Sequence, residues 1–126
     1  MYVGYQFPEV VKEEITHTQL VKYAGASGDF NPIHTVEPIA QLAGLGGVIA
    51  HGMLIMGFAG QAIGTWFPIE KLEKFKVRFQ AMTRPGEAIT IRGQIKDETE
   101  TSWKCEAIAV NEKDEVKLKA TFEVKK

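Results

Sequence analysis

The chain has 126 residues, of which 44% are hydrophobic and 25% are charged, which is sufficient for one globular domain spanning residues 1–126. Its 15 basic and 16 acidic side chains give a net charge of -1, without the basic excess of a typical nucleic-acid-binding protein. The N-terminus lacks the features of a signal peptide, and a single cysteine, Cys105, excludes an internal disulfide. We therefore expect a cytoplasmic protein that binds no nucleic acid.

The first elements expected along the chain are a short strand and a helix. Residues from about 5 to 15 are predicted to form an entry segment with a short strand, because EVVKEEI (residues 9–15) alternates only loosely and Pro8 disfavours a central position in a sheet. Thr16 and Gln19 have the spacing of a capping box. The apolar residues that follow predict a helix over residues 17–26, which ends at Gly28.

Residues 27–50 are predicted to form a long, ordered connection. Asn31 and Pro32 favour a turn, residues 38–43 a short helix, and residues 44–47 a glycine-rich approach to the next element. Long ordered loops often carry function. We therefore expect the functional residues of this half of the chain to lie here.

Residues 51–66, HGMLIMGFAGQAIGTW, are predicted to form a helix that is apolar on all sides. Such a helix must be buried. The run is shorter than the ~20 apolar residues of a membrane span, so we expect a core helix and no membrane span. Its four glycines each disfavour the helix by about 1 kcal/mol relative to alanine, so we expect the rest of the chain to surround and support it.

The remaining sequence alternates between apolar and polar residues and predicts four strands, over residues 74–81, 89–96, 103–109 and 116–124. Each strand has one polar face, on which Lys117 and Lys119 are expected, and one apolar face, on which Cys105 is expected to pack. An antiparallel sheet of this kind needs an apolar partner, and the helix over residues 51–66 is available. The pattern indicates the α+β class.

Two short motifs make the prediction more specific. The segment SGDFNPIH (residues 27–34), preceded by YAGA and followed by IAHGML (residues 49–54), resembles the signature of the MaoC-like hydratases and dehydratases, which include R-specific enoyl-thioester hydratases. This resemblance implies a single hot-dog domain, in which a curved antiparallel sheet wraps around the helix at about residues 51–66. The family often has an acidic residue at the position of Val36, whereas here the acidic residue is Glu37.

The same resemblance assigns the candidate site residues. Asp29 and His34 correspond to the catalytic dyad, the backbone N–H of Gly52 to the oxyanion hole, and Asn31 to a residue that binds the dyad or the substrate. The chemistry is consistent with these residue types, because adding water to an enoyl thioester requires proton transfer at the α carbon and handling of water at the β carbon. The free amides at the N-terminus of a helix are suited to stabilise the thioester oxygen.

Each of these residues also has an ordinary structural interpretation. Taken singly, Asp29 and Asn31 are common turn residues and His34 is a common loop histidine; their combination with the downstream HGM favours catalysis. We expect His51 to cap or pack at the start of the helix and His17 to lie on the surface. No cluster has metal-ligand spacing, and GLGG (residues 44–47) lacks the context of a nucleotide motif, so we expect neither a metal nor a redox cofactor.

Three functions agree with the sequence. The first is an R-specific enoyl-CoA hydratase of fatty-acid metabolism, and the second is a (3R)-hydroxyacyl carrier-protein dehydratase of fatty-acid synthesis. The third is a non-catalytic thioester-binding subunit, which the presence of both Asp29 and His34 disfavours; a hot-dog thioesterase is disfavoured because such enzymes do not rely on a DxNPxH loop. The expected partners are an acyl-CoA or acyl-carrier-protein substrate and a second copy of the chain in a homodimer.

Overall fold

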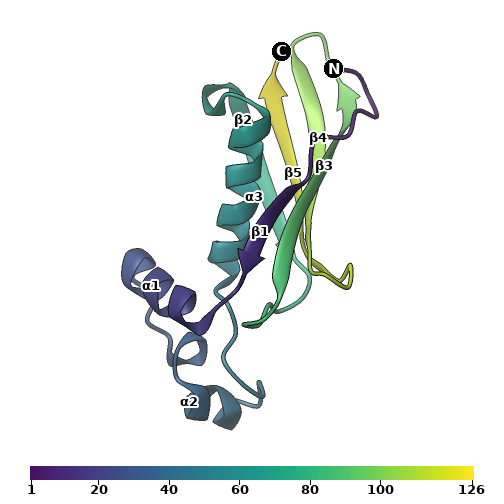
Figure 1. The fold of residues 1–126 in the computed structure, drawn as a ribbon. Coiled ribbons are helices and arrows are strands. Elements are labelled where there is room, and N and C mark those ends of the chain that lie inside the picture. The colour runs from purple at the N-terminus through teal and green to yellow at the C-terminus, as the bar shows by residue number, and fades with distance from the viewer.

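The structure, a computed structural model, describes all residues 1–126 and consists of one sheet, one long helix and two shorter helices. The helices are α1 (His17–Ser27), α2 (Glu37–Leu42) and α3 (Gly52–Trp66), with single 3-10 turns η1 (Pro32–His34) and η2 (Ile69–Lys71). The strands are β1 (Val10–Glu14), β2 (Leu72–Phe79), β3 (Ala88–Glu98), β4 (Ser102–Val110) and β5 (Val116–Lys125). In Figure 1, α3 lies along the sheet, and α1 and α2 lie beyond its N-terminal end.

The sheet is antiparallel throughout, with the strand order β1-β3-β4-β5-β2. β3, β4 and β5 therefore pair on both sides, while β1 and β2 form the two edges. The prediction of a short strand within residues 5–15, away from the sheet centre, is confirmed by the edge strand β1, and the four later strands are also present. This single domain with a five-stranded antiparallel sheet and a central helix confirms the predicted hot-dog fold.

The local signals for α1 also act as predicted. The Thr16 hydroxyl accepts a hydrogen bond from the backbone N–H of Gln19 at 3.1 Å, which caps the helix start. Gly28 ends the helix in the left-handed conformation (φ 75°), which glycine adopts without steric penalty.

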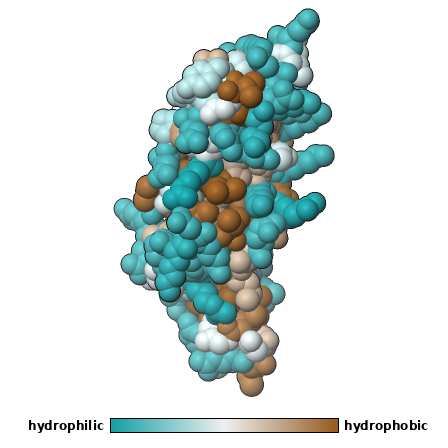
Figure 2. Space-filling model, turned by 90° about the vertical axis from the view of Figure 1, so that its right-hand side faces the viewer, coloured by the Kyte–Doolittle hydropathy of each residue, from teal (hydrophilic) through white to brown (hydrophobic).

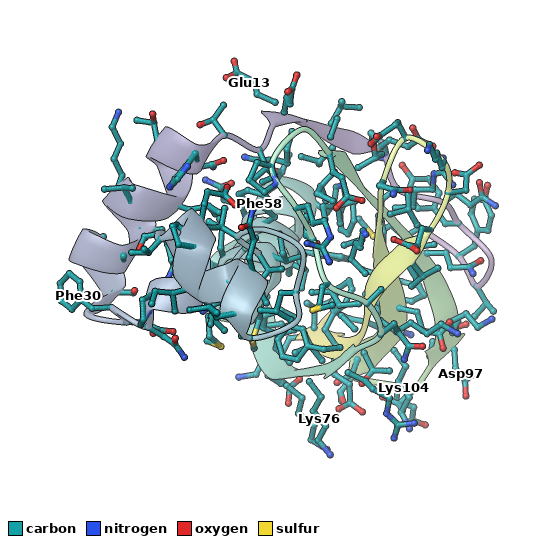
Figure 3. The ribbon with its side chains drawn as sticks, turned by 90° about the horizontal axis from the view of Figure 1, so that it is seen from below. Glu13, Phe30, Phe58, Lys76, Asp97 and Lys104 are labelled. Carbon is teal, nitrogen blue, oxygen red and sulfur yellow. The ribbon has the colours of Figure 1, made fainter.

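The core lies between α3 and the inner face of the sheet. Six residues of α3 are buried: Leu54, Ile55, Phe58, Ala59, Ala62 and Ile63. They pack in one cluster with the inward residues of β3, β4 and β5, and Phe58 is seen near the centre of the molecule in Figure 3. Cys105 packs in the same cluster, where burial raises the pKa of its thiol to about 12. The thiol is therefore protonated at neutral pH, as its predicted packing role requires.

The expectation that α3 is surrounded on all sides is wrong for the single chain. Its opposite face carries Met53, which is 59% exposed, and the exposed residues Gly57, Gln61 and Gly64. The sheet covers one side of α3, and no other part of this chain covers the opposite side. Hydrophobic side chains also reach the surface at the lower end of the molecule in Figure 2. In α2, Leu42 is 85% exposed. Neither α3 nor any other helix has the length and apolar character that a membrane crossing requires.

A close contact at the C-terminal end of α3 fixes how the helix lies on the sheet. The Trp66 indole stacks on Phe7 with ring centroids 4.7 Å apart and donates a hydrogen bond from Nε1 to the carbonyl of Pro8 at 2.8 Å. Its ring lies directly over Gly93 of β3, where an added Cβ would be only 2.7 Å from Cη2 and Cζ3 of Trp66. Glycine is therefore required at position 93 for this close approach.

We expect Gly93→Ala to lower the free energy of unfolding by about 1–3 kcal/mol, because the added methyl must displace an indole held by two other contacts. Urea denaturation measures the change. Gly64→Ala is the matched control, because an added Cβ there meets no atom within 4 Å. Alanine is also the better helix former, so the stability of this variant should equal or exceed that of the wild type. Equal stabilities of Gly93→Ala and the wild type would contradict the proposed packing constraint.

Candidate active site

The loop from Gly28 to His34 is held by its own side chains. Asp29 Oδ1 accepts a hydrogen bond from the backbone N–H of Asn31 at 3.2 Å, and Asn31 Oδ1 accepts one from Ile33 at 3.2 Å. Asn31 thereby caps η1, whose first residue is Pro32. Here the side chain of Asn31 shapes the turn, which is the ordinary structural role that its residue type suggests.

His34 is the buried member of the predicted pair. It is 8% exposed, and its Nδ1 lies 2.7 Å from the backbone carbonyl oxygen of Ile49. Because a carbonyl oxygen only accepts hydrogen bonds, Nδ1 carries the hydrogen in this contact, and in the neutral imidazole Nε2 then has a free lone pair. The structure thus presents His34 as a base at Nε2.

The free Nε2 of His34 faces the carboxylate of Asp29. Nε2 and Oδ2 are 4.0 Å apart, and the side chain of Asp29 is 53% exposed. That separation is too long for a direct hydrogen bond, but both atoms can reach one shared oxygen atom at about 2.8 Å. The loop therefore brings the two titratable groups together in an arrangement that can hold a water molecule or a substrate hydroxyl between them.

Gly52 begins α3 on the other side of His34. The segment before it, Val48–His51, is held from both sides, because Ile49 N–H donates to Ile33 O at 3.2 Å and Ala50 N–H donates to Thr83 O at 2.7 Å. The first backbone amides of a helix have no acceptor within the helix. A Cβ at Gly52 would lie 3.1 Å from Cε1 of Phe79, so any side chain at this position would crowd that ring.

A cleft of about 330 Å³ opens at this point. Its walls come from η1, the start of α3, the loop that joins β2 to β3, and the first part of β5. His34, Ile49, Gly52, Ile55, Phe79 and Lys117 are among the lining residues. The cleft is therefore lined mainly by apolar residues, with His34 and the start of α3 on one wall.

The prediction that Lys117 lies on the polar face of β5 is wrong. The pairing of β4 with β5 shifts between Ala109↔Leu118 and Val110↔Val116, so Lys117 is the extra residue of a β-bulge. Bulges redirect side chains. Lys117 is 2% exposed, and its Nζ donates to the carbonyl of Met82 at 2.8 Å. The strict alternation assumed from the sequence fails at this bulge.

Two carboxylates compensate the buried charge of Lys117. Its Nζ pairs with Glu87 Oε1 at 2.8 Å and with Glu115 Oε1. Burial alone would lower the pKa of Lys117, but the hydrogen bonds to Glu115 and Glu87 outweigh it and raise the pKa. Burial alone would raise the pKa of Glu87, but hydrogen bonds from Lys117, Asn111 and the Arg84 amide together lower it. This ion-pair cluster links β5 to the β2–β3 loop. The same loop accepts the hydrogen bond from the Ala50 backbone N–H.

His51 lies closer to the predicted dyad than the sequence suggested. It occupies the N-cap position of α3 without capping it, and its ring stacks on that of His34 with centroids 3.8 Å apart. Potential ligand atoms of Asp29, His34 and His51 all lie within 4.8 Å of one another. The rings are nearly parallel (23°), however, so the lone pairs in their planes do not converge on one point as metal ligands at about 2.0–2.1 Å must. The donor set does not fit a metal ion in this arrangement.

Comparison with known proteins identifies the family. The sequence model of the MaoC-like domain matches residues 3–119. The chain belongs to the MaoC-like domain family. The solved R-hydratase PhaJ1 of Pseudomonas aeruginosa, in its unliganded form, has the same fold, with a TM-score of 0.86, 22% identity, and coverage of 98% of this chain and 81% of that chain.

Three curated relatives are similar over part of the chain. The 3-hydroxybutyryl-CoA dehydratase of Methylorubrum extorquens is 30% identical over 91 residues, which are 71% of this chain and 58% of that protein. The (R)-specific enoyl-CoA hydratase of Rhodospirillum rubrum is 35% identical over 78 residues, 60% of this chain and 54% of that protein. Fatty acid synthase subunit beta of Gibberella zeae is 35% identical over 88 residues, 64% of this chain but only 4% of that protein. The matched region thus spans just over half of the first two proteins and a small part of the third.

The structure brings some of the predicted site residues close together. Asp29, His34 and Gly52, chosen from the motifs, lie around the same helix start, whereas Asn31 caps the turn between them. His51 packs at the start of the helix, as predicted. The sequence did not indicate the burial of Lys117, the Ile49 carbonyl that orients His34, or the contacts of His51 with Asp29 and His34. The HGM motif was a signal for His51, since a histidine directly before the expected oxyanion glycine must lie near the loop; no local pattern marks the bulge at Lys117.

We expect Lys117→Met to lower the free energy of unfolding at pH 7 by about 2 kcal/mol, because hydrogen bonds of a buried charged group are lost. The folded-state pKa of Glu87 is lowered, so its stabilising contribution is present above its unfolded-state pKa and is lost as the pH falls through the folded-state value. The stability difference between variant and wild type should therefore shrink in acid. Urea denaturation from pH 7 to pH 3 measures it.

Lys119→Met is the control for this prediction, since Lys119 is exposed on the same strand. A change within about 0.5 kcal/mol is expected there at every pH. A pH-independent loss for Lys117→Met would show that packing of its side chain, and not its charge, stabilises the fold.

Proposed function

We propose that this chain is a hydro-lyase that catalyses the reversible hydration of trans-2-enoyl thioesters to (R)-3-hydroxyacyl thioesters. The observation that supports this most directly is the free Nε2 of His34, 4.0 Å from Oδ2 of Asp29 and beside the first turn of α3. Two titratable groups around a space for one oxygen atom, next to unpaired amides, match what this reaction needs. Membership of the MaoC-like family and the names of the relatives that the chain resembles agree with this chemistry.

In the proposed dehydration, His34 and Asp29 act on adjacent carbon atoms of the substrate. Nε2 of His34 takes the proton from C2, and the electron pair of that C–H bond forms the C2–C3 double bond. The bond between C3 and the hydroxyl breaks, and the hydroxyl takes a proton from Asp29 and leaves as water. Hydration follows the same path in reverse and begins with Asp29 ionised and His34 protonated: Asp29 takes a proton from water as the water oxygen attacks C3, and His34 gives its proton to C2. After either direction, one proton passes between Asp29 and Nε2 of His34, through the oxygen atom held between them, and restores the starting state.

The thioester oxygen gains negative charge during this reaction. In our proposal the backbone N–H of Gly52 donates a hydrogen bond to it, and the positive end of the α3 dipole adds to the stabilisation. A donor of this kind is typically worth roughly 3–4 kcal/mol in the transition state. The apolar residues that line the cleft lower the local dielectric constant and so strengthen such an electrostatic interaction.

A carrier-protein substrate is the alternative for the same chemistry. The similarity to a segment of a fatty acid synthase beta subunit favours it as a second candidate, a (3R)-hydroxyacyl carrier-protein dehydratase. A non-catalytic thioester-binding subunit is the third candidate. Parallel assays with crotonyl-CoA and crotonyl-carrier protein distinguish the two enzymes, because the preferred carrier gives the larger kcat/KM. If neither substrate is hydrated, the result supports the non-catalytic subunit.

We expect the purified chain to remove the enoyl absorbance of crotonyl-CoA without releasing free thiol, and to form the (R)-3-hydroxy product, as chiral chromatography would show. Asp29→Asn and His34→Ala should each lower kcat at least a hundredfold, since each removes a group that transfers a proton. Circular dichroism should stay unchanged, because the loop lies outside the core. Release of thiol with the enoyl group intact would instead identify a thioesterase, and near-normal activity in either variant would remove that residue from the mechanism.

We further propose that the chain forms a homodimer. β2 pairs only with β5, so its other edge has free backbone groups, and β2 ends beside the cleft at Phe79. Phe79 and Met82 are 51% and 49% exposed, and the uncovered face of α3 adds Met53. A second copy whose sheet joins along β2 would pair the free edge and cover these side chains.

Multi-angle light scattering is expected to give twice the 14.0 kDa mass of the chain. Replacing Val77, in the middle of β2, by proline should shift the protein towards the monomer, since proline disrupts edge pairing. A wild-type protein that is monomeric at micromolar concentration would contradict the proposal.

A further inference from the structure

His51 is a buried side chain that contacts both members of the candidate dyad. It is 1% exposed, Nε2 lies 3.1 Å from the backbone carbonyl of Asp29, and the ring stacks on that of His34. Tyr23 of α1 also packs edge-on against the His51 ring, with ring centroids 4.8 Å apart. His51 therefore contacts both α1 and His34, directly before Gly52.

The hydrogen-bonding state of His51 follows from its contacts. The Asp29 carbonyl only accepts, so Nε2 carries the hydrogen and Nδ1 has a free lone pair. Nδ1 is buried and has no hydrogen-bonding partner. An unsatisfied buried nitrogen destabilises the folded state, and an apolar side chain would avoid that penalty. Packing alone therefore does not explain a histidine at this position, whereas the N–H donor and the flat ring do.

The two contacts act on different parts of the proposed chemistry. The N–H of Nε2 anchors the backbone of Asp29, whose carboxylate belongs to an otherwise exposed loop. The ring face supports the His34 imidazole, whose other fixed contact is the Ile49 carbonyl at Nδ1. Small displacements of reacting groups have large effects on rate.

We propose that His51 is a positioning residue, which holds Asp29 through its Nε2–H and His34 through ring stacking. This inference rests on the proposed hydratase function. It assigns His51 no proton transfer and no contact with the substrate. It accounts together for the burial of the residue, its orphaned Nδ1 and its place immediately before the oxyanion glycine.

Two variants separate the contacts. His51→Phe keeps a ring against His34 but removes the donor to Asp29, whereas His51→Gln keeps an amide donor near the position of Nε2 but removes the ring. We expect each to lower kcat for crotonyl-CoA hydration at least tenfold while KM stays within about threefold. We also expect the melting temperature of His51→Phe to equal or exceed that of the wild type, since the orphaned nitrogen is removed. A wild-type kcat in either variant would overturn the role of the contact that it removes, and a loss of activity that only follows loss of folded protein would overturn both.

His17→Gln is the matched control. His17 also places Nε2 against a loop carbonyl, that of Thr35 at 2.8 Å, but it is exposed and does not contact the dyad. The kcat of His17→Gln should remain within twofold of the wild-type value. A tenfold loss there would show that any histidine anchoring this loop has the same effect, and would overturn a special role for His51.

Amide hydrogen exchange tests the positioning role independently of activity. If the wild type hydrates no enoyl thioester, the proposed function is refuted, but the exchange experiment still tests whether His51 holds the loop. In His51→Phe the amides of Asn31, Ile33 and His34, which are hydrogen-bonded within the loop, should exchange at least tenfold faster, while those of β3 and β4 remain unchanged. In His51→Gln they should stay near the wild-type rate. Unchanged loop exchange in His51→Phe would overturn the proposed anchoring of Asp29.

Discussion

The geometry of the candidate site depends on the main-chain segment Val48–His51, which leads into α3. It is held on one side by η1, through Ile33 and His34, and on the other by the β2–β3 loop, through the Thr83 carbonyl. Backbone hydrogen bonds of this kind allow little displacement. Because the first amide of α3 follows this segment directly, the same contacts that orient the His34 ring also place the helix terminus beside it.

Packing of α3 against the sheet also holds the C-terminal end of the helix in place. The helix has poor intrinsic propensity because of its glycines, so its stability comes from the apolar face that it buries against β3, β4 and β5. Trp66 over Gly93 sets the position of its C-terminal end, and the segment before Gly52 sets the position of its N-terminus. The helix thus combines a core-packing role with a terminus available for electrostatic stabilisation.

The charged cluster around Lys117 shows how a feature of the sheet can support a site that lies in loops. The bulge in β5 buries the lysine, and Glu87 and Glu115 compensate its charge. Through Glu87 and the Met82 carbonyl, the cluster fixes the β2–β3 loop, which in turn binds Ala50. Such a buried ion pair is not a strong source of stability in general, but it specifies one conformation of the loop. By contrast, Lys76 and Lys104 point away from the sheet into solvent (Figure 3).

The sequence by itself determined the elements of this protein and the candidate residues. Capping at Thr16, the glycine that ends α1, the apolar run of α3 and the period-two strands depend on interactions between near neighbours, so the α+β class follows from them. The DFNPIH and HGM motifs indicated the family and, with it, Asp29, His34 and Gly52. Only the tertiary structure decided the burial of Lys117, the uncovered face of α3, and the contacts of His51 with both Asp29 and His34. These features depend on strand register and on residues far apart in the chain, which pack together only after the sheet and helix have formed.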